Sequence, residues 1–212
     1  MADLKRLFDA VVNGDAAVAR EIVTQALAEG TDPLRLVNES LIPAMDEVGK
    51  RFECNDYFVP ELLVAARAMK GALDLVRPLL TARGDKPAGR VAIGTVQGDL
   101  HDIGKNLVGS LLEGGGFEVV DLGVNVPPQK FVAAVKDQAV NIIAMSALLT
   151  TTMPSMRSSI EALRQAGVRD KVKVLIGGAP ISQKYADEIG ADGYSENAVG
   201  AVALAKKAVA LA

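Results

Sequence analysis

The stretch that decides the fold begins at residue 90, where the β-branched run Arg90-Val-Ala-Ile-Gly-Thr-Val96 precedes Gln97-Gly-Asp-Leu-His-Asp-Ile-Gly-Lys-Asn106. Apolar residues then recur at helical spacing over residues 103–112. The same order of a short run and a helical segment repeats downstream. The runs cover 118–122, 141–146, 172–177 and 191–194, and the helical segments cover 128–138, 153–166, 182–189 and 197–211. This alternation predicts a parallel sheet with helices on both faces, which binds ligands beyond the carboxyl ends of its strands.

Upstream of this stretch, the apolar residues recur at spacings of three and four from Asp3 to about Leu80. Four helices are predicted around the apolar stripes at residues 4–11, 18–27, 36–48 and 62–76, with Asp32-Pro33 at the start of the third and Pro60 at the start of the fourth. Four such apolar stripes are buried most simply in a four-helix unit. The polar, glycine-containing stretch Thr81–Gly89 predicts a linker. We therefore expect a helical domain over residues 1–88 and an α/β domain over residues 89–212.

The composition excludes several classes of protein. The 212 residues are 50% hydrophobic with a net charge of −3, and neither half is basic, which argues against a nucleic-acid partner. No signal peptide and no apolar run near the ~20 residues of a membrane span is found, so we expect a cytoplasmic protein without membrane contact. One cysteine, Cys54, and one histidine, His101, exclude multi-ligand zinc sites and Cys–His nucleophile pairs.

The loop after the first predicted strand fits none of the common phosphate or acyl-transfer motifs. A P-loop needs glycine where Asp99 stands and Ser or Thr where Asn106 stands. The dinucleotide pattern G-x-G-x-x-G and the nucleophile elbow G-x-S-x-G are both absent. The loop instead offers an imidazole beside a carboxylate.

Asp99-x-His101 has the composition of a good single metal ligand. A carboxylate that accepts the N–H of one ring nitrogen fixes the tautomer and raises the basicity of the other nitrogen. One protein ligand cannot hold a bare ion tightly, so the other ligands would come from a macrocycle or another chain. Taken alone, a single histidine in a polar loop is more often a solvated or helix-capping side chain than a ligand.

Three motifs at fixed spacing make the reading specific. Asp99-x-His101-x-x-Gly104 is followed after 41 residues by Ser146-x-Leu148, and after 28 more by Gly177-Gly178. This series resembles the signature of the cobalamin-binding domain that takes its cofactor base-off and His-on. The helical part, with Phe52 and the segment 58–63, resembles the cap of methionine synthase. Together the resemblances cover nearly the whole chain and point to the small corrinoid proteins of methanol, methylamine, betaine and methoxyaromatic methyltransferase systems.

The resemblance implies a role for each matching residue. His101 would be the lower axial ligand of cobalt, and Asp99 would hydrogen-bond its ring. The relative has a serine where this chain has Thr152, so the retained hydroxyl could complete the relay while the added methyl group puts its geometry in doubt. The cofactor-binding residues implied are Gly98, Asp99, His101, Asp102, Ile103, Gly104, Ser146, Leu148, Thr150, Thr152, Gly177 and Gly178.

On the helical domain, the resemblance places Phe52, Val59 and Leu62 over the upper face of the corrin, where they would shield the methyl group. Without the neighbouring corrin motif, the same apolar stripe would be read as plain bundle core. The predicted fold is therefore an all-α four-helix cap followed by an α/β flavodoxin-like (Rossmann-type) parallel-sheet domain.

The function implied is that of a corrinoid methyl carrier, which is not catalytic without its partner. Its cobalamin or related corrinoid would pass through cob(I)alamin and methylcobalamin, with cob(II)alamin as the accidentally oxidised form. The implied partners are a substrate-specific methyltransferase, a second methyltransferase using tetrahydrofolate, tetrahydromethanopterin or coenzyme M, and a reductive activator. Two alternatives are a cobalamin-dependent sensor or regulator, which would need a basic helix-turn-helix segment, and the small subunit of an adenosylcobalamin mutase, which would not need the cap.

Overall fold

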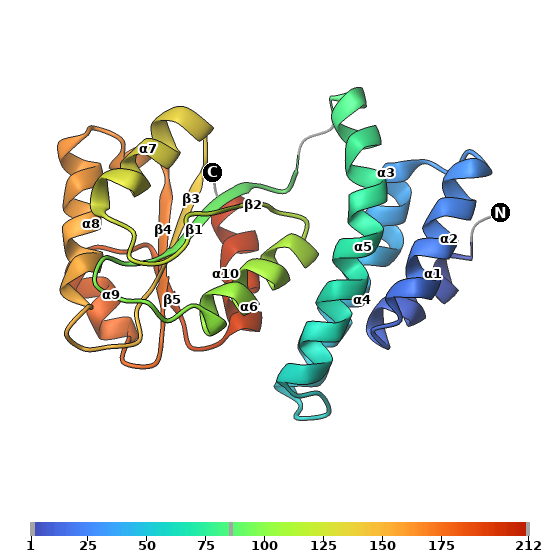
Figure 1. Cartoon of the computed structure of the whole chain (residues 1–212), viewed down its shortest axis with the longest axis horizontal. Helices are drawn as coiled ribbons and strands as arrows, with labels where there is room; N and C mark the ends of the chain where they lie inside the picture. Colours follow the sequence, from blue (N-terminus) through green and yellow to red (C-terminus); the bar gives the residue numbers. More distant parts are fainter. Residues whose placement is uncertain (1–2, 85–86, 211–212) are drawn as a thin grey trace. The chain divides into compact units, whose positions relative to one another are not determined.

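The structure is a computed structural model that describes residues 3–84 and 87–210, and its chain separates into two compact units (Figure 1). The first unit is built from the chain up to Pro87 together with Glu113–Gly116, and the second from the remaining residues. The first is helical, and the second contains the sheet. The expected fold class, a helical domain followed by a parallel-sheet domain, is confirmed.

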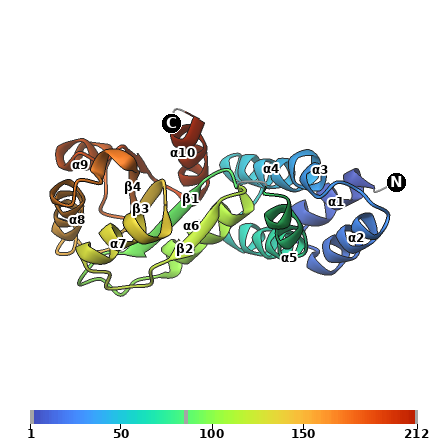
Figure 2. The ribbon, with the colours of Figure 1, turned by 90° about the horizontal axis from the view of Figure 1, so that it is seen from above.

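Acidic caps set where the N-terminal helices begin. The side chains of Asp3, Asp15 and Asp32 each accept a hydrogen bond from a backbone amide of the first turn that follows. α1 packs against α2 and α4, and α5 packs against the same two helices, which closes the four-helix arrangement (Figure 2). No described helix is long and apolar enough to cross a membrane. The elements are α1 (Leu4–Val12), α2 (Ala16–Ala28), α3 (Pro33–Leu36), η1 (Val37–Leu41), α4 (Ile42–Glu53) and α5 (Val59–Arg83).

The third predicted helix is continuous but contains one π-helical turn, η1. The amide of Ile42 donates to the carbonyl of Val37, five residues earlier. Pro43 follows directly, and a proline removes one donor and clashes with the carbonyl four residues before it. The wider turn accommodates that proline without ending the helix.

The linker starts later than the sequence predicts. We expected helical structure to end before Thr81, but α5 continues to Arg83 and is capped by Gly84 in the left-handed conformation, with φ of 78°. The Thr81 hydroxyl donates to the carbonyl of Arg77, so the hydrogen bond it needs is made within the helix. Of the rest of the predicted linker, Asp85 and Lys86 lie outside the described residues.

The second unit is a five-stranded sheet in the order β2-β1-β3-β4-β5, with every neighbouring pair parallel. Its strands are β1 (Arg90–Thr95), β2 (Glu118–Asp121), β3 (Ile142–Ser146), β4 (Lys173–Gly177) and β5 (Gly193–Ser195). The connecting elements are α6 (Ile103–Gly114), α7 (Pro128–Gln138), α8 (Pro154–Gln165), η2 (Arg169–Lys171) and α9 (Gln183–Ile189), and α10 (Ala198–Ala210) follows β5. The last predicted helix extended to Leu211, which lies outside the described residues.

Each face of the sheet buries its own apolar cluster. Phe131 of α7, Ile160 of α8 and Ile189 of α9 belong to one cluster, whereas Leu112 of α6 and Ala205 of α10 belong to the other. The chain therefore leaves β1 toward one face and leaves β3 toward the opposite face (Figure 1). The loops that follow these two adjacent strands diverge there, and such a point is where a doubly wound sheet binds its ligand.

Candidate functional site

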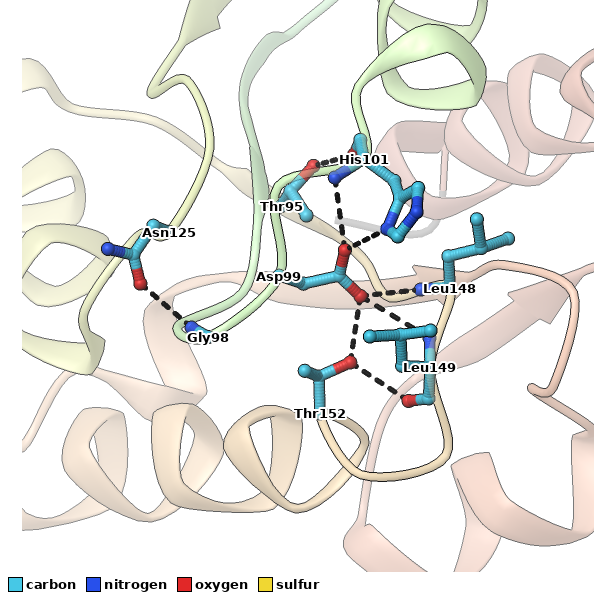
Figure 3. Close-up of polar contacts among 8 residues, drawn as sticks. All are labelled: Thr95, Gly98, Asp99, His101, Asn125, Leu148, Leu149 and Thr152. Atoms are coloured by element: carbon cyan, nitrogen blue, oxygen red, sulfur yellow. Dashed lines mark hydrogen bonds and ion pairs between the residues drawn. The ribbon is translucent and has the colours of Figure 1, made fainter.

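The loop between β1 and α6 carries Asp99 and His101 at this point of divergence. The loop after β3, residues 147–153, lies against it (Figure 3). Parallel pairing of β1 with β3 puts Thr95 opposite Ser146, so both loops leave the same edge of the sheet. The topology thus joins two motifs that are about 40 residues apart in the sequence.

Asp99 is completely buried, and both of its carboxylate oxygens accept hydrogen bonds. Oδ1 accepts from the backbone amide of His101 at 3.1 Å and lies 2.7 Å from the ring Nδ1 of that residue. Oδ2 accepts from the Leu148 amide at 2.8 Å, the Leu149 amide at 3.4 Å and the Thr152 hydroxyl at 2.7 Å (Figure 3). One carboxylate therefore connects the two loops.

These contacts keep the buried carboxylate charged. Burial by itself raises the pKa of Asp99, but hydrogen bonds from the Leu148 amide, from the His101 amide and ring, and from the Thr152 hydroxyl outweigh it. The net effect holds the pKa of Asp99 well below its ordinary value. An ionised carboxylate only accepts hydrogen bonds. In the 2.7 Å contact with His101, the proton must therefore sit on Nδ1.

With the proton on Nδ1, the neutral form of the His101 ring carries its lone pair on Nε2. The side chain is 53% exposed even though its partner Asp99 is buried, so the ring stands at the surface with one edge fixed. The carbonyl of His101 is fixed as well, because it accepts a hydrogen bond from the buried hydroxyl of Thr95 at 2.8 Å. A neutral imidazole held in this way is preorganised as a single metal ligand through Nε2.

Thr152 holds its hydroxyl where a relay would need it. The hydroxyl oxygen lies 2.7 Å from Asp99 and 2.8 Å from the carbonyl of Leu149. The methyl carbon Cγ2 faces Gly98, at 3.6 Å from the position that a Cβ would take there. The extra methyl group therefore fits against a glycine and does not displace the hydroxyl from Asp99.

Large apolar side chains are exposed around the histidine loop. Leu100 is 71% exposed and Ile103 is 85% exposed, and Leu148 and Leu149 of the facing loop are each 43% exposed. Apolar side chains of this size gathered on two adjoining loops mark a surface that something covers. Together with a half-exposed imidazole, they fit a flat, largely apolar macrocycle that brings its own metal.

The predicted glycines Gly104, Gly177 and Gly178 differ in what a side chain at each position would meet. A Cβ at Gly104 would meet nothing within 4 Å, so open space is left at that position. A Cβ at Gly177 would lie 3.2 Å from the carbonyl of Ser195. At Gly178, where φ is 130°, a Cβ would lie 1.9 Å from the carbonyl oxygen of Ala147. The protein's own backbone therefore requires Gly178, whereas Gly104 leaves room for a ligand.

The remaining predicted residues lie at the edges of this site. Asp102 is exposed and accepts from the side-chain amide of Asn106 one turn later, at 3.2 Å. Ser146 is partly buried at the end of β3, and Thr150 is exposed in the turn before α8. Gly98 donates its amide to the side chain of Asn125 at 2.8 Å (Figure 3).

Thr95 and Asn125 are among the contributors that escaped the sequence analysis. Thr95 is a strand residue with no motif around it, and its contact with the His101 carbonyl depends on how the loop folds back. Asn125 lies after β2, some 25 residues from the loop it contacts. The only sequence signal at Asn125 is an asparagine within a loop, and asparagine tolerates the left-handed conformation found there, with φ of 52°.

The three predicted cap residues differ in exposure. Val59, the first residue of α5, is 44% exposed, Phe52 is partly buried, and Leu62 is fully buried. Phe58 and Leu63 at the same end of α5 are 61% and 46% exposed. Val59 is therefore the most accessible of the predicted three.

Comparison with known proteins gives consistent matches over the chain. The family of B12 binding domains matches residues 89–203, and a second family described in the same words matches residues 3–77. The trimethylamine corrinoid protein of Methanosarcina barkeri is 44% identical over 203 residues, which cover 95% of this chain and 94% of the relative.

Two solved structures are similar over 98% of this chain. The first is a cobalamin-binding protein from Desulfitobacterium hafniense DCB-2, of which 99% is covered, with 34% identity and a TM-score of 0.81. The second belongs to the methanol:cobalamin methyltransferase complex MtaBC of Methanosarcina barkeri, of which 79% is covered, with 29% identity and a TM-score of 0.86.

The two glycines with different surroundings give a paired prediction. We expect Gly178→Ala to lower the free energy of unfolding by roughly 2–4 kcal/mol, because the new Cβ would overlap a carbonyl oxygen and the φ is unfavourable. Gly104→Ala, in the first turn of α6, should leave stability unchanged or slightly higher. Urea unfolding measures both variants, and an equal loss in the two would contradict this assignment.

Thr152 allows a second test, because its hydroxyl and its methyl group can be removed separately. Thr152→Val keeps the shape but leaves Asp99 without one donor, so we expect a loss of about 1–3 kcal/mol in unfolding free energy. Thr152→Ser keeps the donor and should lose less. Thermal unfolding compares the two, and a larger loss in the serine variant would mean that methyl packing matters more than the hydrogen bond.

Proposed function

We propose, from the premise that this chain belongs to the B12-binding family of corrinoid proteins, that it carries methyl groups on the cobalt of a bound corrinoid between two methyltransferases. When bound, the corrinoid supplies a cobalt that cycles between cob(I)alamin, which accepts a methyl group, and methylcob(III)alamin, which donates it. The observation that carries the proposal is the half-exposed imidazole of His101, fixed through Nδ1 by the buried Asp99.

In this proposal His101 would hold the cobalt of the bound corrinoid through Nε2. The Asp99 carboxylate holds the proton on Nδ1 and directs the lone pair of Nε2 outward. Thr152 and the amide of Leu148 hold Asp99 in turn, so the imidazole would keep one orientation toward the corrinoid. Asp99 and Thr152 therefore act by holding the ring of His101 in position and by keeping the proton on Nδ1.

The loops around His101 are proposed to hold the rest of the cofactor. Ile103, Leu148 and the other exposed apolar side chains of the two loops offer contact to the macrocycle. The open space at Gly104 and the polar positions beside it offer room for the nucleotide tail. The complete set proposed is Gly98, Asp99, His101, Asp102, Ile103, Gly104, Ser146, Leu148, Thr150, Thr152, Gly177 and Gly178.

The partners proposed follow from the relatives. A similar chain occurs in the solved methanol:cobalamin methyltransferase complex, which supports a substrate-specific methyltransferase as the first partner. The 44% identity to a trimethylamine corrinoid protein favours a methylamine as the methyl donor. A second methyltransferase, using tetrahydrofolate, tetrahydromethanopterin or coenzyme M, and a reductive activator complete the proposed system.

Isotope labelling tests the ligand assignment. Protein uniformly labelled with nitrogen-15 and loaded with unlabelled cobalamin should give a Co(II) electron paramagnetic resonance spectrum in which each hyperfine line is split into a doublet. Unlabelled protein should give triplets, because the coupled nucleus then has a different spin. Triplets from the labelled protein would show that the cofactor's own benzimidazole is the ligand and would overturn the assignment to His101.

The redox potential gives an independent measurement. His101→Ala should raise the Co(II)/Co(I) midpoint potential, because the imidazole stabilises the higher oxidation state. Asp99→Asn should raise it less, because the ring keeps a hydrogen-bond partner but loses the charge that supports it. Equal potentials in the wild type and both variants would remove the ligand role from this loop.

The cap residues Phe52, Val59 and Leu62 are proposed to shield the methyl group from water and oxygen. Val59→Ala and Phe52→Ala should therefore speed the loss of methylcobalamin under light and air, as followed by absorption. Leu79→Ala is the matched control, since Leu79 is 42% exposed, close to the 44% of Val59, but lies at the other end of α5. The same acceleration in the control would show that general loosening of α5, and not shielding, is responsible.

A further inference from the structure

We propose that Asn125 and Ser155 are positioning residues that clamp one peptide group of the histidine loop and thereby set the place of the Asp99 carboxylate. Neither residue belongs to a motif of the sequence, and neither is within the set assigned to the cofactor. The inference rests on the proposed function for its biological meaning, whereas its geometry can be tested without any cofactor.

The loop that carries Asp99 opens with a tight turn over residues 96–99. The amide of Asp99 donates to the carbonyl of Val96 at 3.1 Å, and Gly98 at the third position has a φ of 88°. A hydrogen bond between the first and fourth residues with positive φ at the third is the signature of a type II turn. Type I and type II turns differ mainly in the orientation of their central peptide, here the one between Gln97 and Gly98.

Both polar ends of that central peptide are held by side chains from other elements. Its N–H, on Gly98, donates to Oδ1 of Asn125 at 2.8 Å (Figure 3). Its carbonyl, on Gln97, accepts from the hydroxyl of Ser155 at 3.0 Å. A flip of the peptide toward the type I orientation would break both bonds, so the pair holds the turn in one of its two forms.

Asn125 also holds the next residue of the loop. Its own amide donates to the carbonyl of Asp99 at 2.9 Å, so the Gly98–Asp99 segment is bound at both ends by a single residue. The left-handed conformation of Asn125 makes this double contact possible, and asparagine accepts it at little cost. Any other acceptor at this position would need the same backbone.

The two clamp residues belong to different elements, since Asn125 lies beside the sheet and Ser155 lies in a helix. The residues on either side of Asn125 pair with the end of β1, where Thr95 donates to Gly123 at 3.0 Å and Val126 donates to Thr95 at 2.9 Å. Ser155 lies in the first turn of α8, only three residues after Thr152, which donates a hydrogen bond to Asp99. Ser155 and Thr152 therefore hold neighbouring parts of the loop from one short stretch of chain.

The consequence for the site follows from the short distance involved. Asp99 directly follows the clamped peptide, and its carboxylate must meet the Thr152 hydroxyl on one side and the His101 ring on the other, both at 2.7 Å. We expect a turn released from the clamp to shift Asp99 enough that its carboxylate no longer makes both contacts. The tautomer of His101 then loses the partner that determines it.

The test uses the full chain without cofactor. Asn125→Gly removes the acceptor and still permits positive φ, Asn125→Asp keeps an acceptor oxygen, and Ser155→Ala removes the second contact. Asn55→Gly is the matched control, because Asn55 also has positive φ, 61°, but lies in the N-terminal unit. Nitrogen NMR of the imidazole, recorded at alkaline pH, reports which ring nitrogen carries the proton, and hydrogen exchange reports the protection of the Gly98 amide.

We expect wild type, N125D and the Asn55 control to share one spectrum with the proton on Nδ1. N125G and S155A should show a mixture of tautomers, and N125G should exchange its Gly98 amide about fivefold faster, the effect of about one net hydrogen bond. In the N125G/S155A double variant, the tautomer mixture should differ little from that of either single variant, because the loss of one contact already releases the peptide. Tautomer populations in N125G and S155A that match wild type would overturn the clamp.

Cobalamin binding separates this inference from the proposed function. With aquocobalamin as the probe, N125G should bind about fivefold more weakly than wild type, and N125D should bind like wild type. If wild type binds no cobalamin while the tautomer still changes in N125G, the proposed function fails and the clamp stands. If wild type binds cobalamin but the tautomer is unchanged in N125G, the clamp is wrong and the proposed function stands.

Discussion

A buried, charged carboxylate is the constraint on which the rest of this structure depends. Burying an isolated charge is costly, and Asp99 offsets that cost with donors from its own loop and from the loop after β3. Both loops must therefore leave adjacent strands on the same edge of the sheet. The strand order meets this requirement, because it places β1 beside β3. The Asp99 carboxylate positioned in this way orients the imidazole of His101.

The site combines rigid parts with exposed parts. Asp99, Thr95 and Thr152 are buried and hydrogen-bonded, whereas the ring of His101 and the side chain of Ile103 stand in solvent. A buried network fixes direction, and an exposed apolar rim provides area for a flat ligand. In the proposed function, this division would let His101 present its lone pair to the cobalt of a bound corrinoid without enclosing it.

The elements of the fold were predictable because their patterns are local. Helical and β-branched runs alternate after residue 90, and the structure has strands and helices within a few residues of each predicted segment. The predicted start of the linker was too early, because the end of α5 has the polar composition of a loop. The Thr81 hydroxyl nevertheless finds its hydrogen-bond acceptor within the helix. The motif also led to Asp99 and His101, whose contact is local in sequence.

What the sequence by itself determined is the set of groups that meet within a few residues: the helices, the strands and the Asp99–His101 pair. The resemblance already implied distant residues such as Thr152. Only the tertiary structure decided which residues outside the motifs complete the site and why residue 178 is a glycine. Asn125 and Ser155 reach the turn before Asp99 from two other connections, and Gly178 is required by the carbonyl of Ala147. The physical reason is that a hydrogen bond or a steric overlap between separate elements depends on strand order and loop path, which no local pattern records.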